Sequence, residues 1–217
     1  MAMDWDPVLH YQEIAVAERY DRERFSSMAG KIFNRLEKYY VAQALRGLPL
    51  DTEILDLPCG TGRLADVLLN KGYRVRGVDV SPAMLEVAKR RVVRYRERFQ
   101  AQVLDIFCLP EDVQPQYDAA LCARVLMHFE LPDQIRFLRN VARLTRHRVI
   151  FTQSLSTPYH RARRGFKRMI GNQASAAHPI TNSELRELLA ASGLRETRRL
   201  RPSRMLTEEV IVIAEKV

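Results

Sequence analysis

Long hydrophobic runs are missing from this sequence. The purest apolar run, 210–214, has five residues, whereas a membrane-spanning helix needs roughly 18. The first residues, MAMDWDPV, lack the basic stretch and apolar region of a signal peptide. Cysteine is also scarce: Cys59, Cys108 and Cys122 lie far apart and form no CxxC pair. This spacing argues against a disulfide scaffold and a structural zinc site, so we expect a cytoplasmic protein that binds no metal.

Lysine is scarce as well, because arginine supplies 29 of the 35 basic residues. The 26 acidic residues leave a net charge of +9, and none of them lies between Asp133 and Glu184. That acid-free stretch holds ten basic residues. Such an excess is typical either of a general arginine bias in composition or of an anionic partner such as nucleic acid, phosphate or sugar phosphate.

Strand and helix signals alternate along most of the chain. Apolar runs predict strands, and amphipathic spacing with capping residues predicts helices. The expected helices are 6–20, 29–45, 63–70, 81–98, 132–145 and 181–192, and the expected strands are 53–57, 73–78, 100–104, 117–122, 148–153, 194–200 and 208–214. Alternation with short connections implies parallel crossovers. We therefore expect an α/β fold: a Rossmann-like, doubly wound, seven-stranded, mostly parallel sheet that ends in an antiparallel hairpin.

The 217 residues, 47% of them hydrophobic, fit one globular domain. Within 1–217 we expect an N-terminal helical cap over 1–48 and a ligand-binding core over 49–154. A basic insertion over 155–180 and a C-terminal helix with a hairpin over 181–217 complete the chain. The arginines of the helix 132–145 recur every three or four residues, which predicts a solvated helical face.

Two glycines and three acids carry the strongest local signal. Residues 54–62, ILDLPCGTG, read as a strand ending in Asp56 and followed by a glycine turn at a helix start. Glycines allow positive φ and close approach to a ligand, and a helix N-terminus attracts anionic groups. Asp79 and Asp105 close the next two expected strands. Open α/β sheets bind ligands at these carboxyl ends, where a carboxylate suits ribose hydroxyls or an exocyclic amine.

This pattern resembles the class I S-adenosylmethionine-dependent methyltransferases of the small-molecule type. LDLPCGTG is similar to their first motif, VDVSPAML to their second, DIFCLP to the segment after the third strand, and YDAALCARVLMHF to the fourth-strand segment. The resemblance implies S-adenosyl-L-methionine as cofactor. Pro58 stands where the family more often has a glycine.

Position by position, the resemblance implies a set of cofactor contacts. The methionine part would meet Asp56, Cys59, Gly60, Thr61 and Gly62; the ribose would meet Asp79; the adenine would meet Val80, Met84, Asp105 and Ile106; the sulfonium side would meet Ala123 and Arg124; and Tyr20 and Arg24 would close over the cofactor.

Two histidines are candidates for proton removal during methyl transfer, because imidazole titrates near neutral pH. His128 follows the fourth expected strand and His160 follows the fifth. Beside His160, the basic insertion carries the candidate substrate-binding residues Tyr159, Arg161, Arg163 and Arg164. Arginines there would clamp phosphate or carboxylate. We expect a small-molecule or glycoconjugate acceptor, anionic in character, methylated on oxygen or nitrogen.

Three alternatives remain open at this point. An RNA methyltransferase would use the basic stretches as a phosphate track, and a non-catalytic protein would bind the cofactor without turnover. A nicotinamide oxidoreductase is the third, because Gly60, Gly62 and Ala65 satisfy GxGxxG/A and Asp79 lies where a ribose-binding acid is expected.

Overall fold

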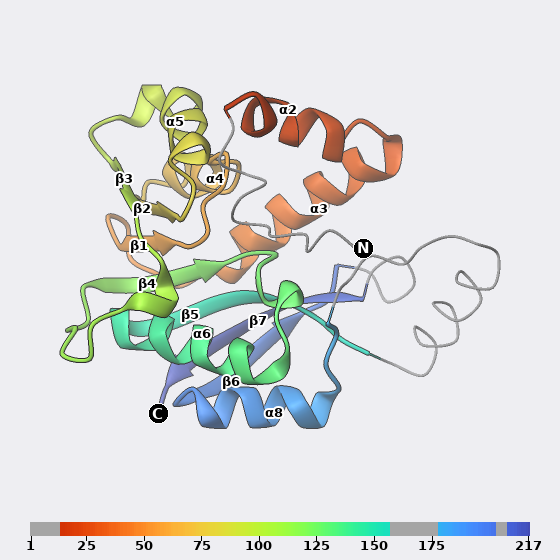
Figure 1. Cartoon of the computed structure of the whole chain (residues 1–217), viewed down its shortest axis with the longest axis vertical. Helices are drawn as coiled ribbons and strands as arrows, with labels where there is room; N and C mark the ends of the chain where they lie inside the picture. The colour runs from red at the N-terminus through yellow and green to blue at the C-terminus, as the bar shows by residue number, and fades with distance from the viewer. Residues whose placement is uncertain (1–13, 157–177, 203–207) are drawn as a thin grey trace, which may run out of the picture.

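A seven-stranded sheet forms the centre of the computed structural model, which describes residues 14–156, 178–202 and 208–217 (Figure 1). The strand order is β3-β2-β1-β4-β5-β7-β6. The strands are β1 (Glu53–Asp56), β2 (Arg74–Asp79), β3 (Phe99–Val103), β4 (Tyr117–Cys122), β5 (Thr145–Ser154), β6 (Leu194–Leu200) and β7 (Glu209–Lys216). The first five run parallel, and β7 pairs antiparallel with both β5 and β6. The expected α/β sheet with its antiparallel C-terminal hairpin is confirmed.

The strand order reverses at β1, which pairs in parallel with β2 on one side and β4 on the other. The chain builds outward from β1 to β3 and then returns to add β4. Such a reversal opens a crevice beyond the carboxyl ends of the two central strands, and open α/β sheets bind their ligands there. The segments that follow β1 and β4 therefore flank that position.

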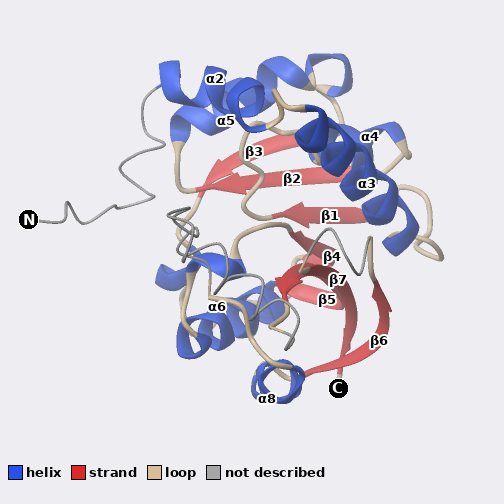
Figure 2. Ribbon diagram, turned by 90° about the vertical axis from the view of Figure 1, so that its right-hand side faces the viewer, coloured by secondary structure: helices blue, strands red, loops and turns tan. Residues whose placement is uncertain are grey.

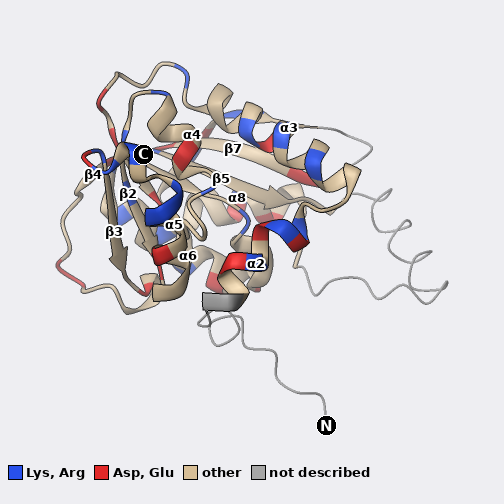
Figure 3. Cartoon of the chain, turned by 90° about the horizontal axis from the view of Figure 1, so that it is seen from above, with Lys and Arg blue, Asp and Glu red and all other residues tan. Residues whose placement is uncertain are grey.

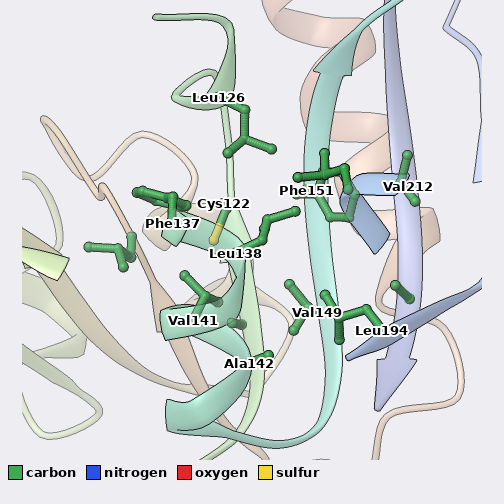
Figure 4. Packing of buried hydrophobic residues seen from close by; sticks show 14 of the residues in the cluster. Cys122, Leu126, Phe137, Leu138, Val141, Ala142, Val149, Phe151, Leu194 and Val212 are labelled. Atoms are coloured by element: carbon green, nitrogen blue, oxygen red, sulfur yellow. The ribbon is translucent and has the colours of Figure 1, made fainter. Parts of the chain in front are cut away.

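Helices cover both faces of the sheet (Figure 2). They are α2 (Ile14–Arg24), α3 (Met28–Ala44), α4 (Ala65–Asn70), α5 (Pro82–Arg91), α6 (Leu131–Leu144) and α8 (Asn182–Ala191), with short 3-10 turns η1 (Val93–Tyr95), η2 (Ile106–Cys108) and η3 (Leu126–His128). Successive strand residues point to opposite faces. Ile150 therefore packs in the cluster that includes α3, α4 and α5, whereas Val149 and Phe151 pack in the cluster of α6 and α8. Figure 4 shows part of the second cluster.

The N-terminal helix α2 lies against α5, and α3 packs on α4 and on β7 of the sheet. Ser27 begins α3 as its N-cap, accepting a hydrogen bond from the Gly30 backbone N–H over 3.0 Å. In α2, Ala17 packs with Ala83 and Met84 of α5. The expected start of the first helix at residue 6 lies outside the described residues.

Local capping signals predicted α8 accurately. The Thr181 hydroxyl accepts a hydrogen bond from the Glu184 backbone N–H, and the Glu184 carboxylate accepts one from the Thr181 N–H. This reciprocal pair satisfies donors that a helix start leaves open. Gly193 follows the helix with φ 68°, as expected for a glycine that ends a helix.

Three expected boundaries are wrong. The helix predicted over 81–98 ends at Arg91, and η1 follows it. The third strand ends at Val103, so Asp105 lies in the loop beyond it. The fifth strand begins at Thr145, which places Arg146 in β5 rather than in the preceding helix.

Arg136 and Arg139 of α6 are exposed, as predicted, and Arg143 is half-buried, but all three also bind backbone carbonyls. Arg136 donates to the Phe107 carbonyl over 2.9 Å, and Arg139 donates to the Ala191 carbonyl through two nitrogens. Arg143 donates to the carbonyl oxygens of Pro110 and Glu111. These guanidinium groups tie α6 to the loop after β3 and to the end of α8.

Candidate functional site

The loop after β1 uses its two glycines for different purposes. Gly60 and Gly62 have φ values of 51° and 73°, which side chains disfavour. A Cβ on Gly62 would lie 3.0 Å from Cα and Cβ of Ala88 in α5, so this glycine permits close packing of the loop on the helix. A Cβ on Gly60 would meet nothing within 4 Å. The backbone at Gly60 therefore borders open space.

Asp79, the last residue of β2, joins that strand to the glycine loop. Its carboxylate accepts a hydrogen bond from the Gly60 N–H over 2.9 Å and another from the Ser81 N–H over 3.0 Å. Burial raises the pKa of Asp79, while backbone hydrogen bonds from Ser81, Gly60 and Val80 oppose the shift. The acid thus lies buried at the carboxyl end of β2, with each oxygen held by a backbone donor.

Asp56, at the end of β1, is buried more deeply, with 1% of its surface exposed. Burial raises its pKa to about 8, against the opposing charge of Arg63. Its Oδ2 has no hydrogen-bond partner among the described residues. A buried carboxyl in this state favours its neutral form and gains from any cation or donor brought near it.

Asp105 and Ile106 lie beyond the end of β3 and differ in exposure. Asp105 is exposed and accepts a hydrogen bond from the Phe107 N–H over 2.9 Å. Ile106 is buried, with 4% of its surface exposed. Together they present a carboxylate and an apolar side chain from adjacent positions of one loop.

Helix α2 is attached to the glycine loop through Asp21. Its carboxylate accepts from the Thr61 hydroxyl over 2.9 Å and pairs with the Arg91 guanidinium over 2.5 Å. Arg91 also donates to the Thr61 hydroxyl over 3.1 Å. Arg24 lies over the Tyr20 ring, with its guanidinium carbon 5.7 Å from the ring centroid. The contacts of Asp21 bring the α2 segment containing Tyr20 and Arg24 beside the loop.

Arg124, two residues beyond β4, has an unusual backbone with φ 61°. Its N–H donates to the Thr152 hydroxyl of β5 over 2.6 Å, which fixes the turn. Its guanidinium lies 4.9 Å above the Phe33 ring of α3 and 3.8 Å from the Glu209 carboxylate. Ala123, which precedes it, is half-buried.

His128 ends the turn η3 after β4 and is exposed. Partial desolvation and the positive charges of Arg24 and His178 lower its pKa. The neutral imidazole therefore predominates at neutral pH, which is the form that accepts a proton.

Sequence reasoning missed two buried glutamates, Glu37 of α3 and Glu209 of β7. Glu37 binds Arg63 of the glycine loop through Oε2 over 2.5 Å, and its Oε1 has no hydrogen-bond partner in the described part of the chain. Burial raises the pKa of Glu37 to about 7, and burial also raises that of Glu209. Glu37 lies four residues from both Phe33 and Val41, so an acid within an apolar helical stripe was the available signal.

Five of the predicted site residues belong to the segment that follows β5. His160, Tyr159, Arg161, Arg163 and Arg164 all lie outside the described residues. Across the described ranges, no three His, Cys, Asp or Glu side chains gather as metal ligands would. No helix in the same ranges has the length and apolar character needed to cross a membrane.

Comparison with known proteins identifies the central part of the chain. Residues 54–148 match the model of a family described as a methyltransferase domain. The ubiquinone biosynthesis O-methyltransferase of Alkalilimnicola ehrlichii is 34% identical over 113 residues, which are 52% of this chain and 44% of that protein. The enzyme of the same name from Coxiella burnetii is 35% identical over 91 residues, 42% of this chain and 38% of its own. The chain thus spans less than half the length of the curated relatives it matches.

Solved structures share the fold at low sequence identity. Magnesium protoporphyrin IX methyltransferase from Synechocystis PCC 6803, solved with bound SAH, aligns with a TM-score of 0.72 at 19% identity. The alignment covers 94% of this chain and 99% of that one. A putative O-methyltransferase from Nostoc punctiforme aligns with a TM-score of 0.70 at 17% identity, over 100% of this chain and 64% of its own.

Proposed function

We propose that the protein is a class I S-adenosylmethionine-dependent methyltransferase that methylates a small molecule or glycoconjugate on oxygen or nitrogen, and the match of residues 54–148 to the model of a methyltransferase domain supports this. The observation that supports the proposal most directly is the hydrogen bond between Asp79 and the Gly60 N–H. It brings a buried carboxylate and an open backbone surface together at the carboxyl ends of neighbouring strands. Ligands of this fold bind at that edge.

The residues at this edge fit S-adenosylmethionine. The open side of Gly60 leaves room for its methionine part beside Cys59, Thr61 and Gly62. Asp56 would accept from the ammonium group, whose positive charge favours the ionised form of a carboxyl that burial otherwise keeps neutral. The ribose hydroxyls would donate to Asp79.

The loop after β3 and the start of α5 would hold the adenine. Asp105 is exposed and would accept from the exocyclic amine, while Ile106 would lie against the ring. Val80 is half-buried and Met84 is buried with 4% of its surface exposed, so both would complete an apolar edge. An apolar pocket with a few placed polar groups is the usual form of such a site.

The bound cofactor supplies a methyl group as the electrophile of a sulfonium. Ala123 and Arg124 would line the sulfonium side, and the fixed backbone of Arg124 would keep that side in place. His128, held neutral by its lowered pKa, would take the proton of the acceptor hydroxyl or ammonium. Tyr20 and Arg24 would close over the site and exclude water.

The anionic character of the acceptor is supported by the sequence alone, through Arg161, Arg163 and Arg164 with Tyr159 and a second histidine, His160. We expect the double variant Arg163→Ala/Arg164→Ala to raise the KM for the acceptor and to leave the Kd for S-adenosylhomocysteine unchanged. An altered cofactor Kd would place these arginines at the other ligand.

Isothermal titration calorimetry with S-adenosylhomocysteine tests the proposal first. We expect it to bind, and we expect NAD to bind at least about tenfold more weakly, a difference of about 1.4 kcal/mol. Binding of NAD without S-adenosylhomocysteine would overturn the proposal. Turnover is then assayed with labelled S-adenosylmethionine on a panel of phenols, glycosides, amines and RNA. Methylation of a small molecule supports the proposal, methylation of RNA indicates an RNA methyltransferase, and binding without turnover indicates a non-catalytic role.

A further inference from the structure

A hollow of about 620 Å³ opens among the N-terminal helices and α4 and α5. Its walls come from the end of α2, the middle of α3, the start of α4 and the end of α5 with η1. Gly60, Asp79, Asp105, Arg124 and His128 do not line it. The volume lies within the range of small-molecule sites, about 300–1,000 Å³. The hollow is therefore separate from the crevice to which we assign methyl transfer.

Positive charge predominates in this hollow. Five basic side chains line it, against the two acids Asp21 and Asp66. The basic residues are Arg22, Lys38, Arg63, Arg91 and Arg94. They converge from α2, α3, the glycine loop, α5 and η1, and Figure 3 shows basic segments on α2, α3 and α5.

Three of the five cations are fixed by nearby polar groups. Arg91 pairs with Asp21, and Arg94 pairs with Asp66 over 2.9 Å. Arg63 donates to the Asn34 side chain over 2.8 Å as well as to Glu37, and its guanidinium lies 4.9 Å above the Phe25 ring. These guanidinium groups are held in position before any ligand arrives, which lowers the cost of binding.

The other two cations, Arg22 and Lys38, have no acidic partner among the described residues. Lys38 is half-buried, and its pKa is lowered by desolvation and by the charges of Arg63 and Arg91, against the opposing effect of Asp66. Like charges are thus held together in a partly desolvated place. An anion that enters the hollow would relieve this repulsion.

We propose that this hollow binds the phosphoryl group of a small ligand, a phosphate or diphosphate ester. Fixed guanidinium groups suit the paired oxygens of a phosphoryl group, and a lysine adds a mobile point charge. With Glu37 counted as the partner of Arg63, the hollow has an excess of two positive charges, which matches a dianionic group better than a single carboxylate. The Phe25 ring offers an aromatic surface to the organic part of such an ester.

Inorganic pyrophosphate is the probe, titrated into the full-length protein at low ionic strength because salt screens exposed charges. Calorimetry should detect binding to the wild type. Lys38→Ala should weaken the Kd roughly tenfold, the effect of losing one charge-assisted contact. Arg35→Ala is the matched control, because Arg35 is an exposed base of the same helix that does not line the hollow. It should change the Kd by less than about twofold.

Thermal unfolding supplies a second measurement that does not depend on methyl transfer. Pyrophosphate should raise the Tm of the wild type and of Arg35→Ala equally, and should raise that of Lys38→Ala by less at the same concentration. Binding of S-adenosylhomocysteine, measured in the same variants, should be unaffected, so this proposal and the proposed function are tested separately.

Three outcomes would overturn the proposal. The wild type fails to bind pyrophosphate, or Lys38→Ala and Arg35→Ala weaken it equally, which would indicate general surface attraction. In the third outcome, Lys38→Ala weakens the binding of a single-stranded oligonucleotide but not the binding of pyrophosphate. The hollow would then be part of a nucleic-acid surface.

Discussion

The carboxylate of Asp79 accepts a hydrogen bond from the backbone N–H of Gly60 over 2.9 Å. One side chain thereby links the end of β2 to the loop that follows β1, nineteen residues earlier. The acid shapes the glycine loop as well as the proposed ribose site, so its substitution has two effects that must be separated.

Asp79→Asn should weaken the Kd for S-adenosylhomocysteine by about ten- to a hundredfold, because an amide replaces one of the two acceptor oxygens with a donor NH2 group. Calorimetry measures this loss. Thermal unfolding of the same variant measures how much stability is lost because the glycine loop is no longer held by Asp79. Glu97→Gln, on an exposed turn, is the control and should keep the wild-type Kd. An unchanged Kd in Asp79→Asn would remove Asp79 from the cofactor site.

The two loop glycines should respond differently to alanine. Gly60→Ala places a Cβ in open space at φ 51°, so we expect a loss of about 1–2 kcal/mol in stability and a strong loss of cofactor affinity. Gly62→Ala adds a contact of 3.0 Å with Ala88 and should lose more stability. Urea unfolding and calorimetry on both variants test the contrast. Equal unfolding midpoints would mean that the loop shifts to accommodate the Gly62 contact.

His128→Ala should lower kcat by about a hundredfold or more with the acceptor that the wild type methylates, and should leave the S-adenosylhomocysteine Kd within about twofold. The acid limb of the wild-type pH–rate profile should lie below the ordinary histidine pKa, because the pKa of His128 is lowered. His147→Ala is the control, because His147 is exposed near the start of β5, away from the carboxyl ends of the strands. A normal kcat in His128→Ala would exclude His128 as the base.

Glu37 should make the protein less stable as the pH rises. Its pKa is about 7 in the folded chain and 4.5 ordinarily, so between these values the folded state binds more protons than the unfolded state. The free energy of unfolding therefore falls with pH through this window, by up to about 1.4 kcal/mol per unit.

Glu37→Gln removes that titration. The difference in unfolding free energy between wild type and variant should shift in favour of the variant from pH 4.5 to pH 7, measured by urea unfolding at each pH. The comparison of the two proteins cancels the contribution of Asp56, whose pKa is also raised. A constant difference across the window would show that Glu37 titrates normally.

Local patterns in the sequence predicted much of the fold. The apolar run at 149–151 predicted a strand, and the pairing of Thr181 with Glu184 predicted the start of α8, because both signals depend on neighbours a few residues away. The position of Asp79 at the edge of the sheet followed from the length of β2.

Contacts between distant segments were not predictable in this way. Arg139 is exposed, as predicted, but its acceptor, the Ala191 carbonyl, lies 52 residues further along and was missed. The burial of Glu37 depends on Arg63, 26 residues away, and on the packing of α3 over the glycine loop. Spacing within one helix carries no information about either partner, so such contacts required the three-dimensional structure.

The antiparallel strand β7 has a practical consequence for making this protein in pieces. The segment that matches the family ends at residue 148, inside β5, whereas β5 pairs with β7 from Arg148 to Ser154. A fragment cut at that match would lose Ile150 and Phe151 and leave β4 as an unprotected apolar edge, which promotes aggregation. An expression clone should therefore extend at least through Lys216, even where only cofactor binding is to be assayed.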